Sequence, residues 1–269
     1  ADAPDPSLNP ELGRVIGGDV ESFEDIDVGR EVELGEASPA EFSASDTEPI
    51  VDEPIGVILH QLIEGNVVER RRAALALSER EPTESVVESL EDATWDEDAE
   101  VRQFAVESLG KLGNDGNEND SEIFDTVHSA MEDSDPWVRS EAVVALHRVS
   151  DDTKPLHEAL DDEHHAVRRN AMIALYKQND GRLDDGNEIT RILVEHLEDP
   201  SERVREWAAH ILGEADSEKA VDALRETANN DESELVRETA ARALDVSGNG
   251  YTGVEPSERN DVLNRKPDL

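Results

Sequence analysis

Two groups of polar residues in this chain carry side chains that metal binding and acid–base catalysis use. In the first group, His157 and Glu158 are adjacent, and His164 and His165 follow shortly after them. Imidazole and carboxylate groups are ligands of iron and zinc, and they also act as general acids and bases. A plainer interpretation is that these histidines occupy exposed polar positions, and we favour it over a metal site.

The second group lies in the loop 113–122, where Asp115, Asn117 and Asn119 alternate like the oxygen ligands of a calcium-binding loop. Such a loop needs a glycine at its sharp turn and a glutamate at its last ligand position. Asp120 and Thr126 stand at those two places. We therefore favour a solvated loop, with a weak cation site as the alternative.

Other chemistry has no motif in the sequence. The chain has no cysteine, which excludes disulfides, thiolate metal sites and cysteine nucleophiles. It also lacks a glycine-rich phosphate loop, a G-x-S-x-G nucleophile motif and an H-E-x-x-H zinc motif. We expect a protein without catalytic, cofactor-binding or metal-binding residues.

Most of the chain consists of sequence repeats, and these would form the helices that position any functional residue. A phrase of the form V-R-x-x-A-A-x-A-L recurs at intervals of roughly 30 to 37 residues, which is typical of a helical solenoid. On a helical wheel its first, fifth, eighth and ninth positions share one face, so each phrase predicts a helix with a buried stripe. The arginines of the phrase are Arg70, Arg102, Arg139, Arg168, Arg205 and Arg237.

Each phrase is preceded by a shorter amphipathic segment, so the repeating unit is a helix–turn–helix pair. The apolar pairs of three of these segments are Val127 with Met131, Leu156 with Leu160, and Leu193 with Leu197. The pattern predicts a solenoid over residues 54–247. An acidic N-terminal extension, 1–53, is expected to be extended or partly disordered, with one candidate hairpin at 26–34, and 248–269 forms a polar tail.

An aspartate stands five residues before the valine of each phrase after the first. In the turn between the two helices its carboxylate can accept backbone N–H groups. The arginine of the phrase lies at the flank of the buried stripe and faces the adjoining repeat. We predict a structural ladder of Asp96, Arg102, Asp133, Arg139, Asp162, Arg168, Asp199, Arg205, Asp231 and Arg237, with Arg70 outside it because the first repeat has no turn aspartate.

The repeated phrase closely resembles the HEAT-like repeats of the type first noted in phycobilisome lyases. The resemblance implies an all-α, right-handed α-α solenoid of about six helix pairs. Some HEAT-like proteins resemble iron-dependent deoxyhypusine hydroxylases, which carry His-Glu pairs at positions three and four of the phrase. No repeat here carries that pair, and His157-Glu158 lies on the preceding helix. A bilin-lyase-like or metallo-hydroxylase-like enzyme, or a cofactor-assembly factor, therefore stays the alternative function.

The charge of the chain narrows the choice of partner. It has 67 acidic and 25 basic residues and a formal net charge of −42. A surface this acidic opposes nucleic-acid binding, which needs basic patches to neutralise phosphate. The composition resembles that of proteins from extremely halophilic archaea, in which salt screens the repulsion. No apolar run is long enough to cross a membrane, and we expect a cytoplasmic protein.

The remaining function is binding of another protein. We expect a non-enzymatic adaptor or scaffold, such as an accessory subunit of a larger complex, whose partner contacts the second helices of the repeats. Basic and aromatic groups at the less buried positions are the candidates, because such groups are common hot spots. Partial burial between repeats is the alternative role for the aromatic ones. The candidate partner-binding residues are Arg71, Arg72, Phe104, Arg169, Trp207 and His210.

Overall fold

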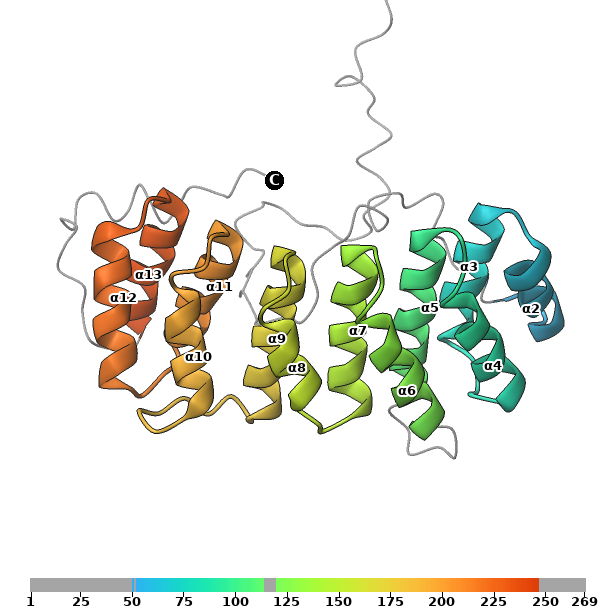
Figure 1. Ribbon diagram of the computed structural model, residues 1–269, viewed down its shortest axis with the longest axis horizontal. Coiled ribbons are helices and arrows are strands. Elements are labelled where there is room, and N and C mark those ends of the chain that lie inside the picture. The colour runs from blue at the N-terminus through green and yellow to red at the C-terminus, as the bar shows by residue number, and fades with distance from the viewer. Residues whose placement is uncertain (1–49, 51, 114–119, 247–269) are drawn as a thin grey trace, which may run out of the picture. The chain divides into compact units, whose positions relative to one another are not determined.

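The computed structural model describes residues 50, 52–113 and 120–246, and these residues form an all-α solenoid, as the repeats predicted. Within them, twelve helices pair in chain order and the pairs stand side by side (Figure 1). The pairs are α2 (Ile55–Glu64) with α3 (Val67–Leu77), α4 (Glu84–Ala93) with α5 (Ala99–Leu112), α6 (Asp120–Ala130) with α7 (Pro136–Val149), α8 (Lys154–Ala159) with α9 (His165–Gln178), α10 (Glu188–His196) with α11 (Glu202–Leu212), and α12 (Glu218–Asn230) with α13 (Glu234–Val246).

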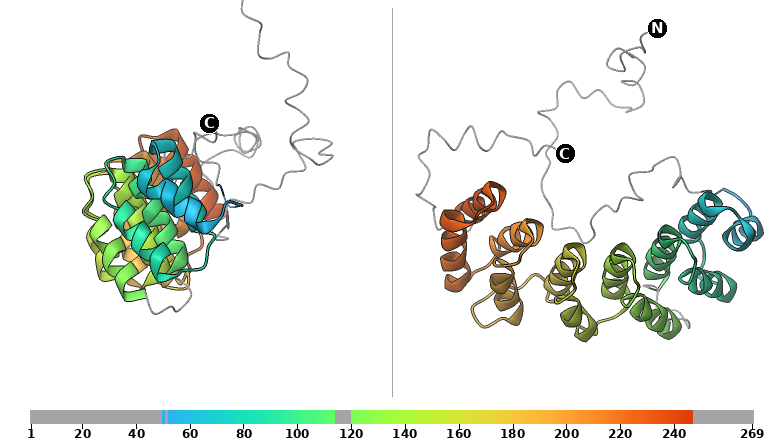
Figure 2. Two further views of the ribbon diagram at one scale, coloured as in Figure 1. Left: turned by 90° about the vertical axis from the view of Figure 1, so that its right-hand side faces the viewer. Right: turned by 45° about the horizontal axis from the view of Figure 1, so that its top comes forward.

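The second helices of the pairs form one row and the first helices form another (Figure 2). The second helices α3, α5, α7, α9, α11 and α13 pack against one another from repeat to repeat. Their fifth phrase position is always alanine and always fully buried, which lets the helix axes approach closely. These alanines are Ala73, Ala105, Ala142, Ala171, Ala208 and Ala240.

Helices α5 and α7 approach each other closely at Gly110. A Cβ atom added at Gly110 would lie 2.5 Å from the Cβ atom of Ala145 and 2.8 Å from its Cα atom. Only glycine therefore fits at this point without moving the neighbouring backbone.

The turns between the helices contain conventional starts for the second helices. Asp98 caps α5 by accepting the N–H of Val101 at 3.1 Å, and Asp135 caps α7, whose first residue is Pro136. At α3, Asn66 and Glu69 form a reciprocal capping box. Such caps satisfy N–H groups that have no partner within the helix.

The first helices bury one apolar residue of each predicted pair more deeply than the other. Val127, Leu156 and Leu193 are fully buried. Met131 and Leu160, which follow the ends of α6 and α8, are only half-buried. These two residues lie where the helix gives way to the turn, whereas Leu197, at the same place after α10, stays buried at 7% exposure.

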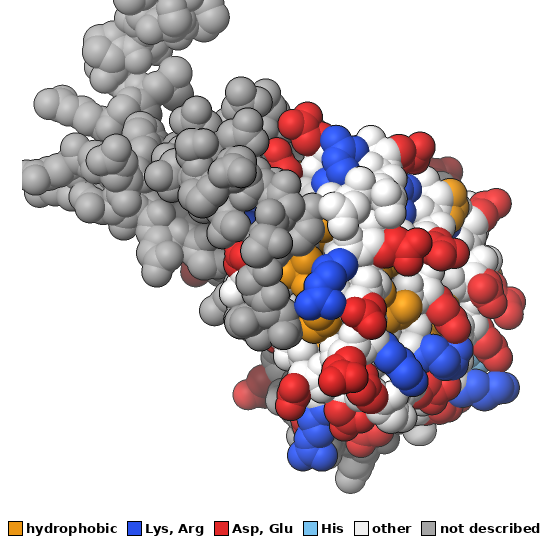
Figure 3. All heavy atoms as spheres, turned by 90° about the vertical axis from the view of Figure 1, so that its left-hand side faces the viewer, with side chains coloured by type: hydrophobic (Ala, Val, Ile, Leu, Met, Phe, Trp, Pro, Cys, Tyr) orange, Lys and Arg blue, Asp and Glu red, His pale blue; other side chains and the backbone are white. Residues whose placement is uncertain are grey.

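The two ends of the row differ in surface chemistry. At α2, Ile55, Val57 and Ile63 are exposed, and Ile63 is 65% exposed. Figure 3 views the end formed by α12 and α13 and shows acidic and basic side chains spread over its described surface. Arg225 and Asp222 of α12 form one ion pair there, at 2.9 Å.

Part of the predicted organisation lies outside the described residues. The hairpin at 26–34, the tail at 248–269 and most of the extension 1–53 belong to this part. Among the helices of the described ranges, none combines the length and the apolar character that a membrane-spanning helix needs.

Candidate functional site

The turns of the solenoid carry a continuous series of arginine–aspartate pairs. The Nε of Arg102 donates to Oδ2 of Asp133 at 2.7 Å, and its second terminal nitrogen donates to Oδ1 at 2.8 Å. The same bidentate contact joins the first five phrase arginines to the turn aspartate of the following repeat. The pairs are Arg70–Asp96, Arg102–Asp133, Arg139–Asp162, Arg168–Asp199 and Arg205–Asp231.

Each arginine also holds its own turn. The remaining terminal nitrogen of Arg168 donates to the carbonyl oxygen of Asp162 at 2.8 Å, and Arg205 makes the same contact with the carbonyl of Asp199. The aspartate carboxylate in turn accepts a backbone N–H two residues later, as Asp199 does from Ser201 at 2.7 Å. One guanidinium therefore ties two consecutive turns together.

Burial and pairing act in opposite directions on these carboxylates. Burial raises the pKa of the Asp133 carboxyl, but the hydrogen bonds from Arg102 and from the Asp135 N–H outweigh it, so this pKa lies below its ordinary value. The same balance lowers the pKa of Asp162 and of Asp199. The carboxylates are thus held in their charged form by the ladder.

The ladder has a direction, which corrects the expectation for the first repeat. Arg70 was expected to lack a partner, yet it binds Asp96 at 2.7 Å, because each arginine reaches forward to the next repeat. At the other end Arg237 donates to the carbonyl groups of Asp231 and Glu232. Among the described residues, no carboxylate contacts Arg237.

Three of the six predicted partner-binding residues lie together on α9 and α11. The guanidinium of Arg169 lies 5.3 Å from the centre of the Trp207 ring, a distance suited to a cation–π contact. His210 packs edge-on against the same ring at 5.5 Å. Trp207 and His210 are half-buried, whereas Arg169 is only 4% exposed and donates to the side-chain oxygen of Asn170. We refer to Arg169, Trp207 and His210 as the α9–α11 cluster.

The other three candidates do not join this cluster. Phe104 is 1% exposed, so it belongs to the core and cannot contact a partner in this conformation. Arg71 pairs with Asp98 at 2.9 Å and with Glu100 at 2.6 Å, and so it stabilises the start of α5. Arg72 is half-buried on α3, in the first repeat.

The histidines of the α8–α9 repeat take structural positions. His157 contacts the carbonyl oxygen of Thr153 at 2.8 Å, and His164 packs against the rings of Trp137 and His165. They are half-buried and not exposed, which corrects the expectation. Within the described ranges no three His, Asp or Glu side chains converge in a way that suits a metal ion. The candidate calcium ligands at 115–119 lie outside those ranges.

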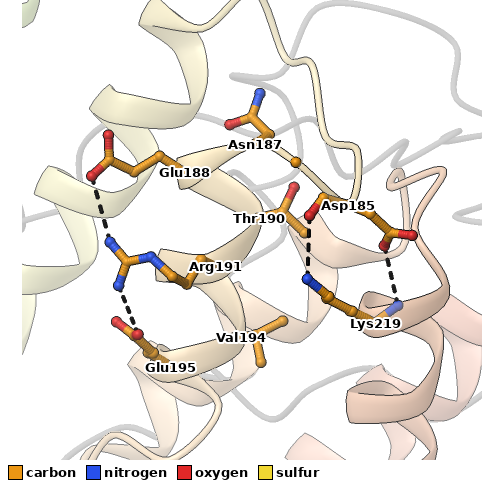
Figure 4. Close-up of a pocket in the computed structure, with 9 residues that line it drawn as sticks. Asp185, Asn187, Glu188, Thr190, Arg191, Val194, Glu195 and Lys219 are labelled. Carbon is orange, nitrogen blue, oxygen red and sulfur yellow. Dashed lines mark hydrogen bonds and ion pairs between the residues drawn. The ribbon is translucent and has the colours of Figure 1, made fainter.

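A pocket of about 450 Å³ lies between α10 and α12 (Figure 4). Figure 4 shows Arg191 between Glu188 and Glu195, at 3.4 and 2.8 Å, and Lys219 beside Asp185. The hydroxyl of Ser217 also donates to Asp185 and lowers the pKa of that carboxyl. The charged groups of this pocket therefore bind one another, and the arrangement favours a structural role.

Sequence reasoning missed Trp95, whose side chain is 81% exposed in the turn after α4. It stands immediately before the ladder residue Asp96. The same position in the later repeats holds Glu132, Asp161, Glu198 and Asn230. An alignment of the repeats column by column would have singled it out.

The comparisons with known proteins agree with this architecture. The family model for HEAT repeats matches residues 116–176 and 153–245. No curated protein sequence matches the chain. A solved structure of the YibA protein of E. coli is similar at 19% identity and a TM-score of 0.57, covering 79% of this chain and 76% of that one. This likeness shows the fold.

Two further solved structures are similar at lower scores. An archaeal HEAT-like repeats protein from Thermococcus onnurineus NA1 has 16% identity and a TM-score of 0.44, covering 80% of this chain and 98% of that one. The complex of CpcE and CpcF of phycocyanin lyase from Nostoc sp. PCC7120 has 18% identity and a TM-score of 0.39, with coverages of 81% and 99%.

Proposed function

We propose that this chain is a non-enzymatic scaffold that binds another protein along its second helices, and the match of residues 116–176 and 153–245 to the HEAT-repeat model supports the proposal. The observation that carries the proposal is the α9–α11 cluster. Two adjacent second helices bring an arginine, a tryptophan and a histidine to one place, and Trp207 is half-buried. Tryptophan and arginine dominate binding energy at many protein interfaces.

The rigidity of the repeats supports this proposal. Binding costs less free energy when the surface is already ordered. The ladder holds successive turns with bidentate ion pairs, and the Arg168–Asp199 pair joins the two repeats that carry the α9–α11 cluster. The cluster is therefore held in a fixed relation across the boundary between these repeats.

The chain offers a competing binding segment. The N-terminal extension is strongly acidic and could contact a basic partner without the repeats. The two alternatives differ in what abolishes binding, so one experiment separates them.

The experiment isolates a partner and then measures its affinity. Proteins that co-purify with the full-length chain are identified from its source organism at high salt, and one purified partner is titrated by calorimetry. Trp207→Ala should weaken binding by at least about 2 kcal/mol, the scale of an interface hot spot. Arg169 is left unchanged because its loss would disturb the buried contact with Asn170.

Two control variants complete the design. Trp137→Ala removes a half-buried ring of the same size from the start of α7 and should leave the affinity unchanged. A variant without residues 1–50 should also retain the partner. Loss of binding in this deletion, together with full binding by Trp207→Ala, would refute the proposed surface.

A further inference from the structure

A second candidate binding site lies on the side of the first helices, between the turn after α4 and helix α6. A groove of about 690 Å³ opens there, at the boundary of the second and third repeats. Its lining includes Trp95 from the turn after α4, Thr126 and Asp125 from α6, and Glu132 from the turn after α6. The ladder pair Arg102–Asp133 also lines it.

The fold itself does not require the tryptophan. Trp95 precedes a ladder aspartate, and the equivalent residues Glu132, Asp161, Glu198 and Asn230 are all exposed polar residues. The repeats thus serve as internal controls, because four equivalent turns form with an acid or an amide at this position. A large ring that is 81% exposed gains no packing free energy within its own chain. Large exposed apolar groups are characteristic of binding sites.

The charge of the groove specifies what could bind against this ring. Four carboxylates line it, from Asp96, Asp125, Glu132 and Asp133, against the one guanidinium of Arg102. Asp96 and Asp133 are already bound by ladder arginines. Asp125 and Glu132 are exposed, and no cation of the described residues pairs with either of them.

Beside the groove, the carboxyl group of Glu91 has further acids around it. Burial raises the pKa of Glu91, and the carboxylates of Glu122, Glu88 and Asp92 raise it further, although a hydrogen bond from Thr126 opposes the shift. A cation entering the groove would therefore meet a negative potential together with an aromatic face.

We propose that this groove binds an arginine side chain in a basic segment of a partner protein, with the guanidinium stacked on Trp95 and donating to Asp125 and Glu132. Arginine fits better than lysine because its planar guanidinium can stack on a ring and donate to two carboxylates at once. The site goes beyond the scaffold function proposed above, since it lies on the first-helix row and uses different residues.

The test measures binding of short fluorescent Gly/Ser peptides to the full-length protein by anisotropy, at molar salt that screens general attraction. The peptides are identical except that they carry two arginines, two lysines or two citrullines. Citrulline keeps the shape of arginine without its charge. We expect the arginine peptide to bind most tightly and the citrulline peptide most weakly.

The deciding variant is Trp95→Glu, which copies the residue at the equivalent position of the next repeat. It makes the protein more acidic, so general electrostatic attraction would strengthen binding of the arginine peptide. Loss of the stacking surface should instead weaken that binding roughly five- to thirtyfold. Trp95→Tyr should restore most of the affinity. Glu198→Gln, at the equivalent turn of a distant repeat, should change it less than about twofold, since a single exposed charge contributes little at high salt.

Two outcomes would overturn the proposal. One is arginine-peptide binding by Trp95→Glu that is as tight as in the unaltered protein, with helicity preserved by circular dichroism. The other is equal affinity for the arginine and lysine peptides, which would show attraction by charge alone. Trp207→Ala should leave peptide binding unchanged, so failure here is distinguishable from failure of the α9–α11 surface.

Discussion

The first and last helix pairs that the structure describes differ in their ion pairs and in their outer surfaces. At the first pair, the ladder arginine Arg70 is fully engaged by Asp96, whereas the outer helix α2 exposes Ile55, Val57 and Ile63. At the last pair, α12 presents charged residues, whereas the ladder arginine Arg237 contacts only carbonyl groups within the described part of the chain. The first pair therefore has a paired ladder arginine and exposed apolar residues. The last pair has a ladder arginine without a carboxylate partner among the described residues and an outer helix with charged residues.

The difference follows from the direction of the ladder. Because every arginine reaches forward, the first described repeat uses no turn aspartate of its own in the ladder, and within the described residues no carboxylate of a later repeat binds Arg237. Each of these two described pairs packs against one neighbouring described pair, so its sequence can depart from the consensus on its other side. Ladder arginines with and without a carboxylate partner should therefore differ in how much their substitution lowers the free energy of unfolding.

The largest expected effect concerns the ladder arginines. Arg168→Ala leaves Asp199, only 6% exposed in its side chain, without its partner, and should lower the free energy of unfolding by about 2–4 kcal/mol. Arg70→Ala should cost nearly as much, because its pair with Asp96 has the same geometry. The measurement is denaturant unfolding followed by circular dichroism at constant salt.

Arg237→Ala is the matched control for these two variants. It removes contacts to carbonyl groups but leaves no buried carboxylate unpaired, so it should cost less than about 1 kcal/mol. Equal losses at Arg168 and Arg237 would show that the ion pairs are not what stabilises the ladder.

A smaller effect is expected from two glycines. Gly110→Ala would force its new Cβ atom against Ala145 and should destabilise the protein by about 1–3 kcal/mol, although alanine favours helix formation. Gly56→Ala on the end helix α2 meets no atom within 4 Å and should stabilise by about 0.5 kcal/mol. Thermal unfolding of both variants gives the sign directly, and stabilisation by Gly110→Ala would contradict the close approach of α5 and α7.

The smallest effect is a change in pH dependence. The pKa of Asp199 is lower in the folded protein than its ordinary value of 3.8. The stability that this carboxylate contributes is therefore present above pH 4 and is lost as the pH falls through the folded-state pKa, because the unfolded chain binds the proton first. Arg168→Ala should flatten the pH dependence there by up to about 1.4 kcal/mol per pH unit, the limit for one proton.

This pH series is best recorded at molar salt, where relief of the repulsion between the many acids contributes least. Arg237→Ala should retain the slope of the unaltered protein. A slope in Arg168→Ala as steep as in the unaltered protein would mean that Asp199 is not the group that titrates.

Periodicity was sufficient to predict the helix pairs and most residues of the ladder, but it left out Arg70, which binds Asp96, and included Arg237, which contacts only carbonyl groups among the described residues. It could not give the direction of pairing, because the spacing of Arg102 from Asp96 and from Asp133 allows contact with either aspartate. Nor could it rank Phe104 and Trp207, which share one phrase position, although only Phe104 is fully buried. The depth of a flank position depends on side chains of the adjoining repeat, which a single repeat does not contain.

The candidate binding residues were harder to predict for a related reason. The sequence pattern pointed to positive and aromatic groups on the second helices, but one of them, Arg71, pairs with Asp98 at the start of the next second helix. Trp95 lies in a turn, outside the periodic pattern, where helix-based reasoning assigns no buried or exposed face. Trp95 could have been found because it differs from the polar residues at the equivalent position of the later repeats, and not because it follows the repeat pattern.

The ladder has a mechanical consequence. Five bidentate pairs run in series along the turns, and each fixes the separation of two neighbouring turns at one edge of the stack. When the solenoid bends, the turns joined by the ladder should keep a nearly constant spacing. The change in spacing should then occur at the opposite edge, where the connections between helix pairs differ in length. The repeats would then rotate about the ladder as a hinge line. A partner that contacts several repeats would change their spacing and twist at the opposite edge, while the spacing of the turns along the ladder stays the same.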